Sequence, residues 1–204
     1  MPKEANGLKW GPEWAGVGMR GNSSRSVELN EVEIPRRDLL GELGDEIWYV
    51  FNVVTPYFVM AMAGTYVGVA TAALQSVVSH VNERRHSHTA APIAQSTIVQ
   101  HRIGELWARV ERTRALLHHA ASVGDEGQTD ALPLLCSSKA EAADCAVNVA
   151  NEVMTLMGGR GYAVESRIHR LLRDARAAHV MAPTTDQLRV WTGRALLGQP
   201  LLAE

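Results

Sequence analysis

The stretch LMGGRGYAVESRIHRLLRDARAAHVMAPTTDQLR, residues 156–189, holds two breaks in a helical pattern, and these breaks decide the fold. The first is Gly158-Gly159, a glycine signal typical of the end of a helix. The second is the uncharged bend MAPTT, residues 181–185, which follows an arginine-rich helix expected at about 166–180. Two helices are therefore expected to meet at a small, neutral, hydroxyl-rich corner.

The bend at 181–185 allows two interpretations. Thr184 and Thr185 offer hydroxyls and Pro183 restricts the backbone, so the corner is a candidate ligand site. The alternative is simple capping of the last helix, which is expected to be capped by Thr185 or Asp186 and to run to 197. The residues of the bend alone leave both readings open.

The pattern is helical throughout from Leu43 onward. Three further helices are expected at about 45–84, 94–122 and 131–157, joined by polar breaks. Together with the helix at 166–180 they predict a mainly α chain that folds as an antiparallel four-helix bundle. Within the first helix, Thr55-Pro56 predicts a kink or a fresh start.

The first helix has no charged residue from Ile47 to Asn82. That length is sufficient to span a bilayer, and Gly64 and Gly68 form a GxxxG pattern. Polar residues inside the run, and the lack of a basic cluster before Ile47, favour a soluble helix instead. We therefore expect a helix that is apolar all round and buried at the bundle centre or at an interface, with no membrane partner.

The first 40 residues differ from the rest, because glycine, tryptophan and serine are frequent there. In SVELNEVEIP, residues 26–35, apolar side chains alternate at Val27 and Leu29 and again at Val32 and Ile34. The phase slips between the two pairs, which predicts a bulge or a turn at residues 30 and 31. Two short strands cannot bury a sheet face alone, so this segment is expected to be the edge of something larger.

Composition excludes several classes of protein. The chain of 204 residues has a net charge of −2, which gives no field that would attract nucleic acid. Cys136 and Cys145 are expected to be buried thiols in a reducing, cytoplasmic compartment, and the start MPKEANGLKW has no apolar core of a signal peptide. No cysteine or carboxylate completes a metal set beside His86 and His88, so no metal site is predicted.

Two further segments are candidate ligand sites. Arg84 and Arg85 either complement the dipole at the end of the first helix or clamp a phosphate, for which arginine is suited. The glycines of LMGGRGY either end a helix or let a backbone approach a ligand closely. The latter motif is not GxGxxG and follows no predicted strand, so a Rossmann nucleotide site is excluded.

Four blocks of the chain resemble the acyl-CoA dehydrogenase family, specifically its C-terminal half. GVGMRGNSSRSVELNEVEIPRRDLLGE (16–42) is similar to the last strand region of the family's middle β-domain. AGTYVGVATAALQSVVSHVNERRHS (63–87) and VQHRIGELWARVERTRALL (99–117) are similar to two of its long helices. SSKAEAADCAVNVANEVMTLMGGRGYAVESRIHRLLRDARAAHV (137–180) is similar to its glycine signature followed by Arg-Asp-Ala.

The resemblance implies a division of the chain and a flavin cofactor. Residues 1–42 are expected to be a remnant of the β-domain, and 43–204 the C-terminal helical bundle domain. Family members carry further N-terminal domains that supply flavin and acyl-CoA contacts, so the chain is expected to be a truncated or split member. FAD is the implied cofactor and an acyl-CoA the implied substrate.

Cofactor contacts are implied at Arg84, Gly158, Gly159, Thr184 and Asp186. Arg84 matches the arginine that reaches the FAD pyrophosphate of a neighbouring subunit, and the two glycines match the turn against the adenosine portion. Thr184 matches a threonine near the flavin, and Asp186 stands where the family often has Gln or Glu. The chain departs from the pattern at Thr155, where Gln is usual, and at Ser87, where an aromatic residue is usual.

The family's catalytic base has no counterpart in this sequence. The reaction needs a carboxylate that removes the proton α to the thioester while hydride passes to the flavin. In most members that Glu begins the final bend, where this chain has Ala182; in a minority it lies on the central helix, where this chain has Phe58 and Val59. No residue of this chain is therefore predicted to be catalytic.

Three functions remain compatible with the sequence. The first is a subunit or fragment of an FAD-dependent acyl-CoA dehydrogenase-like oxidoreductase that needs a partner chain. The second is a non-catalytic helical oligomerisation module, and the third a flavin monooxygenase-type relative on the same fold. In each case we expect a homo- or hetero-oligomer, formed through the bundle helices.

Overall fold

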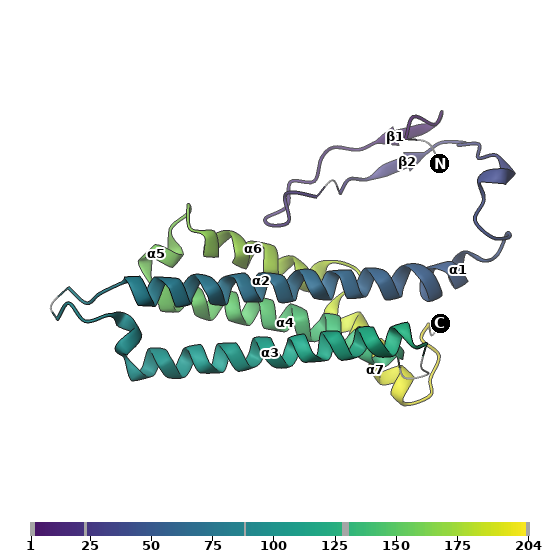
Figure 1. Cartoon of the computed structure of the whole chain (residues 1–204). Helices are drawn as coiled ribbons and strands as arrows, with labels where there is room; N and C mark the ends of the chain where they lie inside the picture. Colours follow the sequence, from purple (N-terminus) through teal and green to yellow (C-terminus); the bar gives the residue numbers. More distant parts are fainter. Residues whose placement is uncertain (1–2, 23, 88, 128–130, 203–204) are drawn as a thin grey trace.

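The computed structural model describes residues 3–22, 24–87, 89–127 and 131–202, and His88 of the histidine pair lies outside them. Figure 1 shows a bundle of long helices with a separate N-terminal segment beside it. The long helices are α2 (Thr55–Glu83), α3 (Thr97–Asp125) and α4 (Ala131–Met157). Two shorter helices, α6 (Arg167–Val180) and α7 (Thr185–Leu196), complete a mainly helical fold, as the sequence predicts.

The helix that contains α2 begins earlier and is continuous through Pro56. Helix α1 (Glu46–Tyr49) leads into a π-helical turn (Val50–Val54), which passes directly into α2. Pro56 lacks an N–H, so a regular α-helical bond to the preceding turn cannot form there. The wider turn absorbs this defect. The kink or restart predicted at Thr55-Pro56 is therefore a local change of helix type.

Helix α4, rather than the charge-free α2, lies at the centre of the bundle. It contacts α2, α3, α5 (Gly159–Tyr162), α6 and α7. The buried alanines of α4 allow this close approach from several sides; they are Ala140, Ala142, Ala143, Ala146 and Ala150.

Helix α2 buries one stripe within the chain, so the prediction that it lies at the bundle centre is wrong, while burial of its other face at an interface stays a prediction. The stripe runs from Val59 to Val81 and faces the other helices. Between residues 47 and 58 most large apolar side chains are exposed; they are Ile47, Trp48, Val50, Val53, Val54, Tyr57 and Phe58. By length and composition the helical stretch Glu46–Glu83 could cross a membrane, a test that the core helix of a soluble protein also passes.

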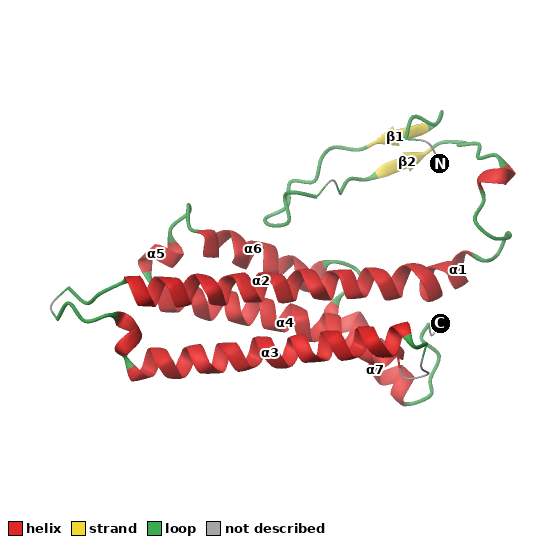
Figure 2. Cartoon of the chain, viewed as in Figure 1, coloured by secondary structure: helices red, strands yellow, loops and turns green. Residues whose placement is uncertain are grey.

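The N-terminal segment contains two short strands, seen as yellow arrows in Figure 2. Strands β1 (Leu8–Trp10) and β2 (Val27–Leu29) pair antiparallel, with Lys9 opposite Glu28. The alternation predicted through residue 34 ends at Leu29, because Glu31 has a positive φ of 50° and turns the chain. A turn of this kind was one of the two outcomes predicted there.

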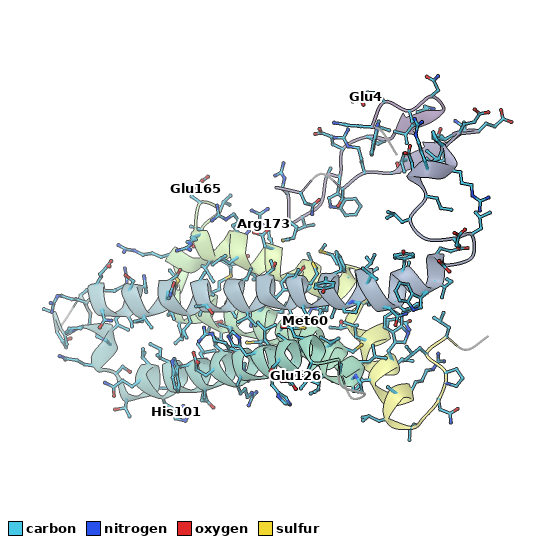
Figure 3. All side chains as sticks on the ribbon, turned by 45° about the vertical axis from the view of Figure 1, so that its right-hand side comes forward. Glu4, Met60, His101, Glu126, Glu165 and Arg173 are labelled. Carbon is cyan, nitrogen blue, oxygen red and sulfur yellow. The ribbon has the colours of Figure 1, made fainter. Side chains whose placement is uncertain are left out.

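The N-terminal segment is hydrogen-bonded to the bundle at two adjacent residues of α6. The Met19 N–H donates to Asp174 Oδ1 at 2.7 Å, and Arg173 Nη1 donates to the Val17 carbonyl at 2.8 Å. Gly18 lies so close that an added Cβ would be 2.2 Å from the Arg173 carbonyl oxygen. Figure 3 labels Arg173 on the side of α6 that faces this segment.

Candidate functional site

The predicted cofactor residues fall into two groups at opposite ends of α6. Arg84, Gly158 and Gly159 precede this helix, whereas Thr184 and Asp186 follow it. A helix rises about 1.5 Å per residue, so the two groups are about 20 Å apart along α6. We call them the glycine-turn group and the bend group.

The three glycines of LMGGRGY differ in whether the fold requires a glycine at that position. Gly158 adopts φ 59° and ψ −143°, a conformation that residues with a side chain rarely adopt. At Gly161 an added Cβ would be 2.9 Å from the Met154 carbonyl oxygen, so α5 packs against α4 only with a glycine there. Gly159 has neither constraint, because an added Cβ would meet no other described atom within 4 Å. The fold therefore requires Gly158 and Gly161 but gives no reason for Gly159.

Positive charge gathers near the glycine turn. Arg84 ends α2 with an exposed side chain, and its carbonyl accepts from the Ile93 N–H at 2.9 Å. The pKa of the buried His80, one turn earlier, is lowered by burial and then by the positive charges of Arg160 and Arg84. Arg160 of the glycine turn and Arg84 at the end of α2 thus both act on His80, with Glu83 opposing them.

Thr184, rather than Thr185 or Asp186, caps α7. Its Oγ1 accepts from the Gln187 N–H at 3.2 Å. Thr185 is buried, and its Oγ1 donates to the His179 carbonyl at 3.5 Å. Capping uses only one acceptor position of the Thr184 hydroxyl, so its proton remains available to a ligand.

A buried lysine beneath the bend was missed in the sequence. Lys139 of α4 has no exposed surface. Its Nζ donates to the carbonyls of Ala178 at 2.7 Å, Met181 at 3.3 Å and Pro183 at 2.9 Å. The available signal was its position: Cys136, Ala142 and Ala143, its neighbours on one helix face, are all apolar and buried.

A second α4 residue holds the two helices that flank the bend. Asp144 accepts from His179 Nε2 at 3.0 Å and from Arg189 Nη2 at 2.5 Å. Asp186 makes only a peripheral contact with this cluster, because its side chain is 94% exposed and lies 3.5 Å from Arg189 Nη1. Asp186 thus points into solvent.

The two family positions of the base provide no proton acceptor. Ala182 lies at the surface of the bend. Phe58 is 42% exposed, whereas Val59 is 1% exposed and packs near Leu188 and Trp191 of α7. A nearby hydroxyl is also unsuited to this role, because burial raises the pKa of Tyr66 to about 12 and its Oη donates to Met181 Sδ.

Comparison with known families agrees with this architecture. A family model described as "Acyl-CoA dehydrogenase, C-terminal domain" matches residues 48–197. Cyclohex-1-ene-1-carbonyl-CoA dehydrogenase of Geobacter metallireducens is 30% identical over 197 residues, which cover 97% of this chain and 51% of the relative. An acyl-CoA dehydrogenase of Bacillus subtilis is 27% identical, over 97% of this chain and 51% of the relative.

Solved structures show the same relationship. The glutaryl-CoA dehydrogenase–glutaryl-CoA complex has a TM-score of 0.89 at 26% identity, covering 98% of this chain and 50% of that one. Butyryl-CoA dehydrogenase from Megasphaera elsdenii has a TM-score of 0.90 at 23% identity, covering 97% and 50% respectively. The chain thus spans about half the length of the curated relatives it matches. With its helical bundle, glycine turn and final bend in this arrangement, the chain belongs to the family of acyl-CoA dehydrogenase C-terminal domains.

Proposed function

We propose that this chain works as part of an FAD-dependent acyl-CoA dehydrogenase-type oxidoreductase, together with a polypeptide that supplies the other half of the relatives' length. The observation that carries the proposal is Gly159, a glycine without a steric reason, beside the electropositive pair Arg84 and Arg160. An open backbone next to arginines suits the phosphates and adenosine of a dinucleotide. The family match over residues 48–197 makes FAD the dinucleotide of choice.

The bound flavin would accept the hydride from the acyl-CoA. In this chain, Arg84 and the Gly158-Gly159 turn would hold the phosphate and adenosine end, and the Thr184 hydroxyl would donate a hydrogen bond to the flavin. The two groups lie about 20 Å apart along α6. We therefore propose that they serve flavins of different subunits, in line with the role of the arginine in the family.

The α-proton of the substrate would be removed by a carboxylate outside positions 58, 59 and 182. A general base must lie within hydrogen-bond reach of the proton or act through one water. Of the carboxylates around the bend, Asp144 is engaged by His179 and Arg189, and Asp174 by the Met19 amide. Asp186 faces solvent. We therefore assign the base to the complementing polypeptide.

The test is the visible spectrum of the purified protein, alone and co-expressed with polypeptides that carry the N-terminal half of an acyl-CoA dehydrogenase. We expect flavin absorbance in a complex, bleaching by an acyl-CoA without oxygen, and no dye reduction by the chain alone. Arg84→Ala should lower the flavin content of the complex, whereas Arg112→Ala, an exposed arginine of α3, should not. Acyl-CoA oxidation by the chain alone would refute the assignment of the base.

The vacant base positions also favour a second candidate function, a non-catalytic oligomerisation module. Such a module would associate through its helices and bind no flavin in any complex. A flavin monooxygenase-type relative, which needs no α-proton base, would instead bind flavin that acyl-CoA fails to bleach. The same spectra therefore separate the three functions.

A further inference from the structure

Lys139 stands out because a charged group is wholly enclosed in the bundle core. The side chain has no exposed surface, and α4 is covered by helices on several sides. Burial lowers its pKa to about 8, so that the ammonium remains charged at neutral pH. Enclosing a charge costs free energy unless polar partners compensate for the lost water. Its partners therefore show what the lysine is for.

All three hydrogen-bond acceptors of Lys139 are backbone carbonyls around the bend: Ala178 in the last turn of α6, then Met181 and Pro183. The last carbonyls of a helix accept no hydrogen bond from an N–H of the same helix, so they need donors from elsewhere. Lys139 supplies such donors, and the last carbonyl that it binds immediately precedes Thr184. The position of Thr184 is thus fixed from inside the bundle.

Asp144 acts on the same corner from the outer side. It joins His179, in the last turn of α6, to Arg189, in the first turns of α7. Lys139 and Asp144 both belong to α4, so one rigid helix holds the bend at its inner and outer sides. A core made only of apolar residues would pack these helices as well, but it would leave the carbonyls of the bend without donors.

We propose that Lys139 is a positioning residue, which holds the carbonyls of residues 178, 181 and 183 and thereby fixes the Thr184 hydroxyl in the orientation that meets the flavin. The flavin contact rests on the proposed function; the ordering of the bend does not. Since residue 182 has no carboxylate, the bend contributes to flavin orientation rather than to proton transfer. Loss of Lys139 should therefore weaken flavin binding without weakening acyl-CoA binding.

The first experiment uses the whole chain without cofactor. Lys139→Met keeps the length of the side chain and removes all its donors. Amide hydrogen exchange at residues 181–188 is expected to become about tenfold faster or more, with little change in α3. Arg114→Met is the control, because Arg114 is likewise a cation that links two helices, but it is half-buried and joins α3 to Thr71 of α2. Unchanged exchange at 181–188 in Lys139→Met, or a uniform rise across all helices, would overturn the positioning role.

The second experiment uses the flavin-containing complex. Lys139→Met should raise the Kd for FAD about tenfold and change the KM for acyl-CoA less than twofold. Thr184→Val should raise the Kd for FAD by a similar factor. The Kd of the double variant should not exceed the higher Kd of the two single variants, because both substitutions act through one hydroxyl. Additive effects, or an unchanged Kd for FAD, would overturn the flavin part. A wild-type complex without flavin would refute the proposed function and with it the flavin part, while the exchange data would still decide the ordering of the bend.

Discussion

At the scale of single residues, Asp186 is the carboxylate that comes next after the bend in sequence, and its geometry argues against a catalytic role. Its side chain is 94% exposed and its partner is Arg189. An exposed carboxylate on the first turn of α7 can interact favourably with the helix dipole, which stabilises the helix by about 0.3–1 kcal/mol. The Asp186 side chain therefore does not point into the bend at 181–185.

We predict that Asp186→Asn leaves the turnover of a flavin-containing complex within about twofold of wild type, because only a surface charge is lost. Turnover with acyl-CoA is the measurement. Replacement of the acidic base in the complementing polypeptide is the comparison and should abolish turnover. A large loss with Asp186→Asn would place the base in this chain.

The adjacent glycines 158 and 159 allow backbone strain to be separated from ligand contact. Both have open space around an added Cβ among the described residues, but only Gly158 has a positive φ. We predict that Gly158→Ala lowers the free energy of unfolding by about 1–3 kcal/mol. Gly159→Ala should stay within about 0.5 kcal/mol of wild type. Denaturant unfolding measures both, and equal losses would contradict the assignment.

His80 should make stability depend on pH. Its pKa in the folded state lies below the ordinary 6.5, because of burial first and then Arg160 and Arg84, with Glu83 opposing. The unfolded chain therefore binds more protons as the pH falls below 6.5, and stability present above that pH is lost.

We predict that the free energy of unfolding falls more steeply from pH 7 to pH 5 in wild type than in His80→Gln. The difference in slope is at most about 1.4 kcal/mol per pH unit for one group. Urea unfolding at several pH values measures it, and His119→Gln, an exposed histidine of α3, is the control. Parallel curves for wild type and His80→Gln would refute the prediction.

At the scale of elements, the sequence predicts which segments are helical but not how they cover one another. The long helices begin and end close to the predicted residues because caps, glycines and polar breaks are local signals. The burial of a helix face, in contrast, depends on which other helices pack against it. The charge-free run 47–82 exposes its first turns, while α4, which contains Lys139 and Asp144, contacts most of the other helices.

The residues of the candidate site differ in the same way: some lie in local sequence motifs, and others depend on tertiary contacts. Arg84, Gly158, Gly159 and Thr184 were identified as candidates because they lie in local motifs, and their roles toward a flavin stay predictions. Lys139 carries no local motif, since its partners are 39 to 44 residues away in the chain. The hydrogen bonds of a buried cation arise from tertiary structure, which the spacing along one helix does not encode. The cap of α7 was misplaced by one residue for a simpler reason, because adjacent hydroxyls and carboxylates all suit that position.

At the scale of the whole molecule, several large apolar side chains are exposed on the bundle. Between α2 and α3 lies a groove of about 470 Å³, lined by Val78, Val81, Val99, Ile103, Gly104 and Trp107, among others. Trp107 is 58% exposed at its edge, and Ile98 of the same helix is 66% exposed. Apolar patches of this kind mark interaction surfaces more often than they mark free surface.

We therefore predict that the chain associates through the bundle, most simply as a dimer, since a two-fold interface lets one groove receive the Trp107 of the other copy. Light scattering at micromolar concentration should give a mass above that of one chain. Trp107→Glu places a charge in the apolar contact and should shift the mass toward the monomer. Trp14→Glu is the matched control, because Trp14 is 65% exposed on the N-terminal segment, away from the groove. A wild-type mass equal to a single chain would refute association, and dissociation by Trp14→Glu instead would move the interface from the bundle to the N-terminal segment.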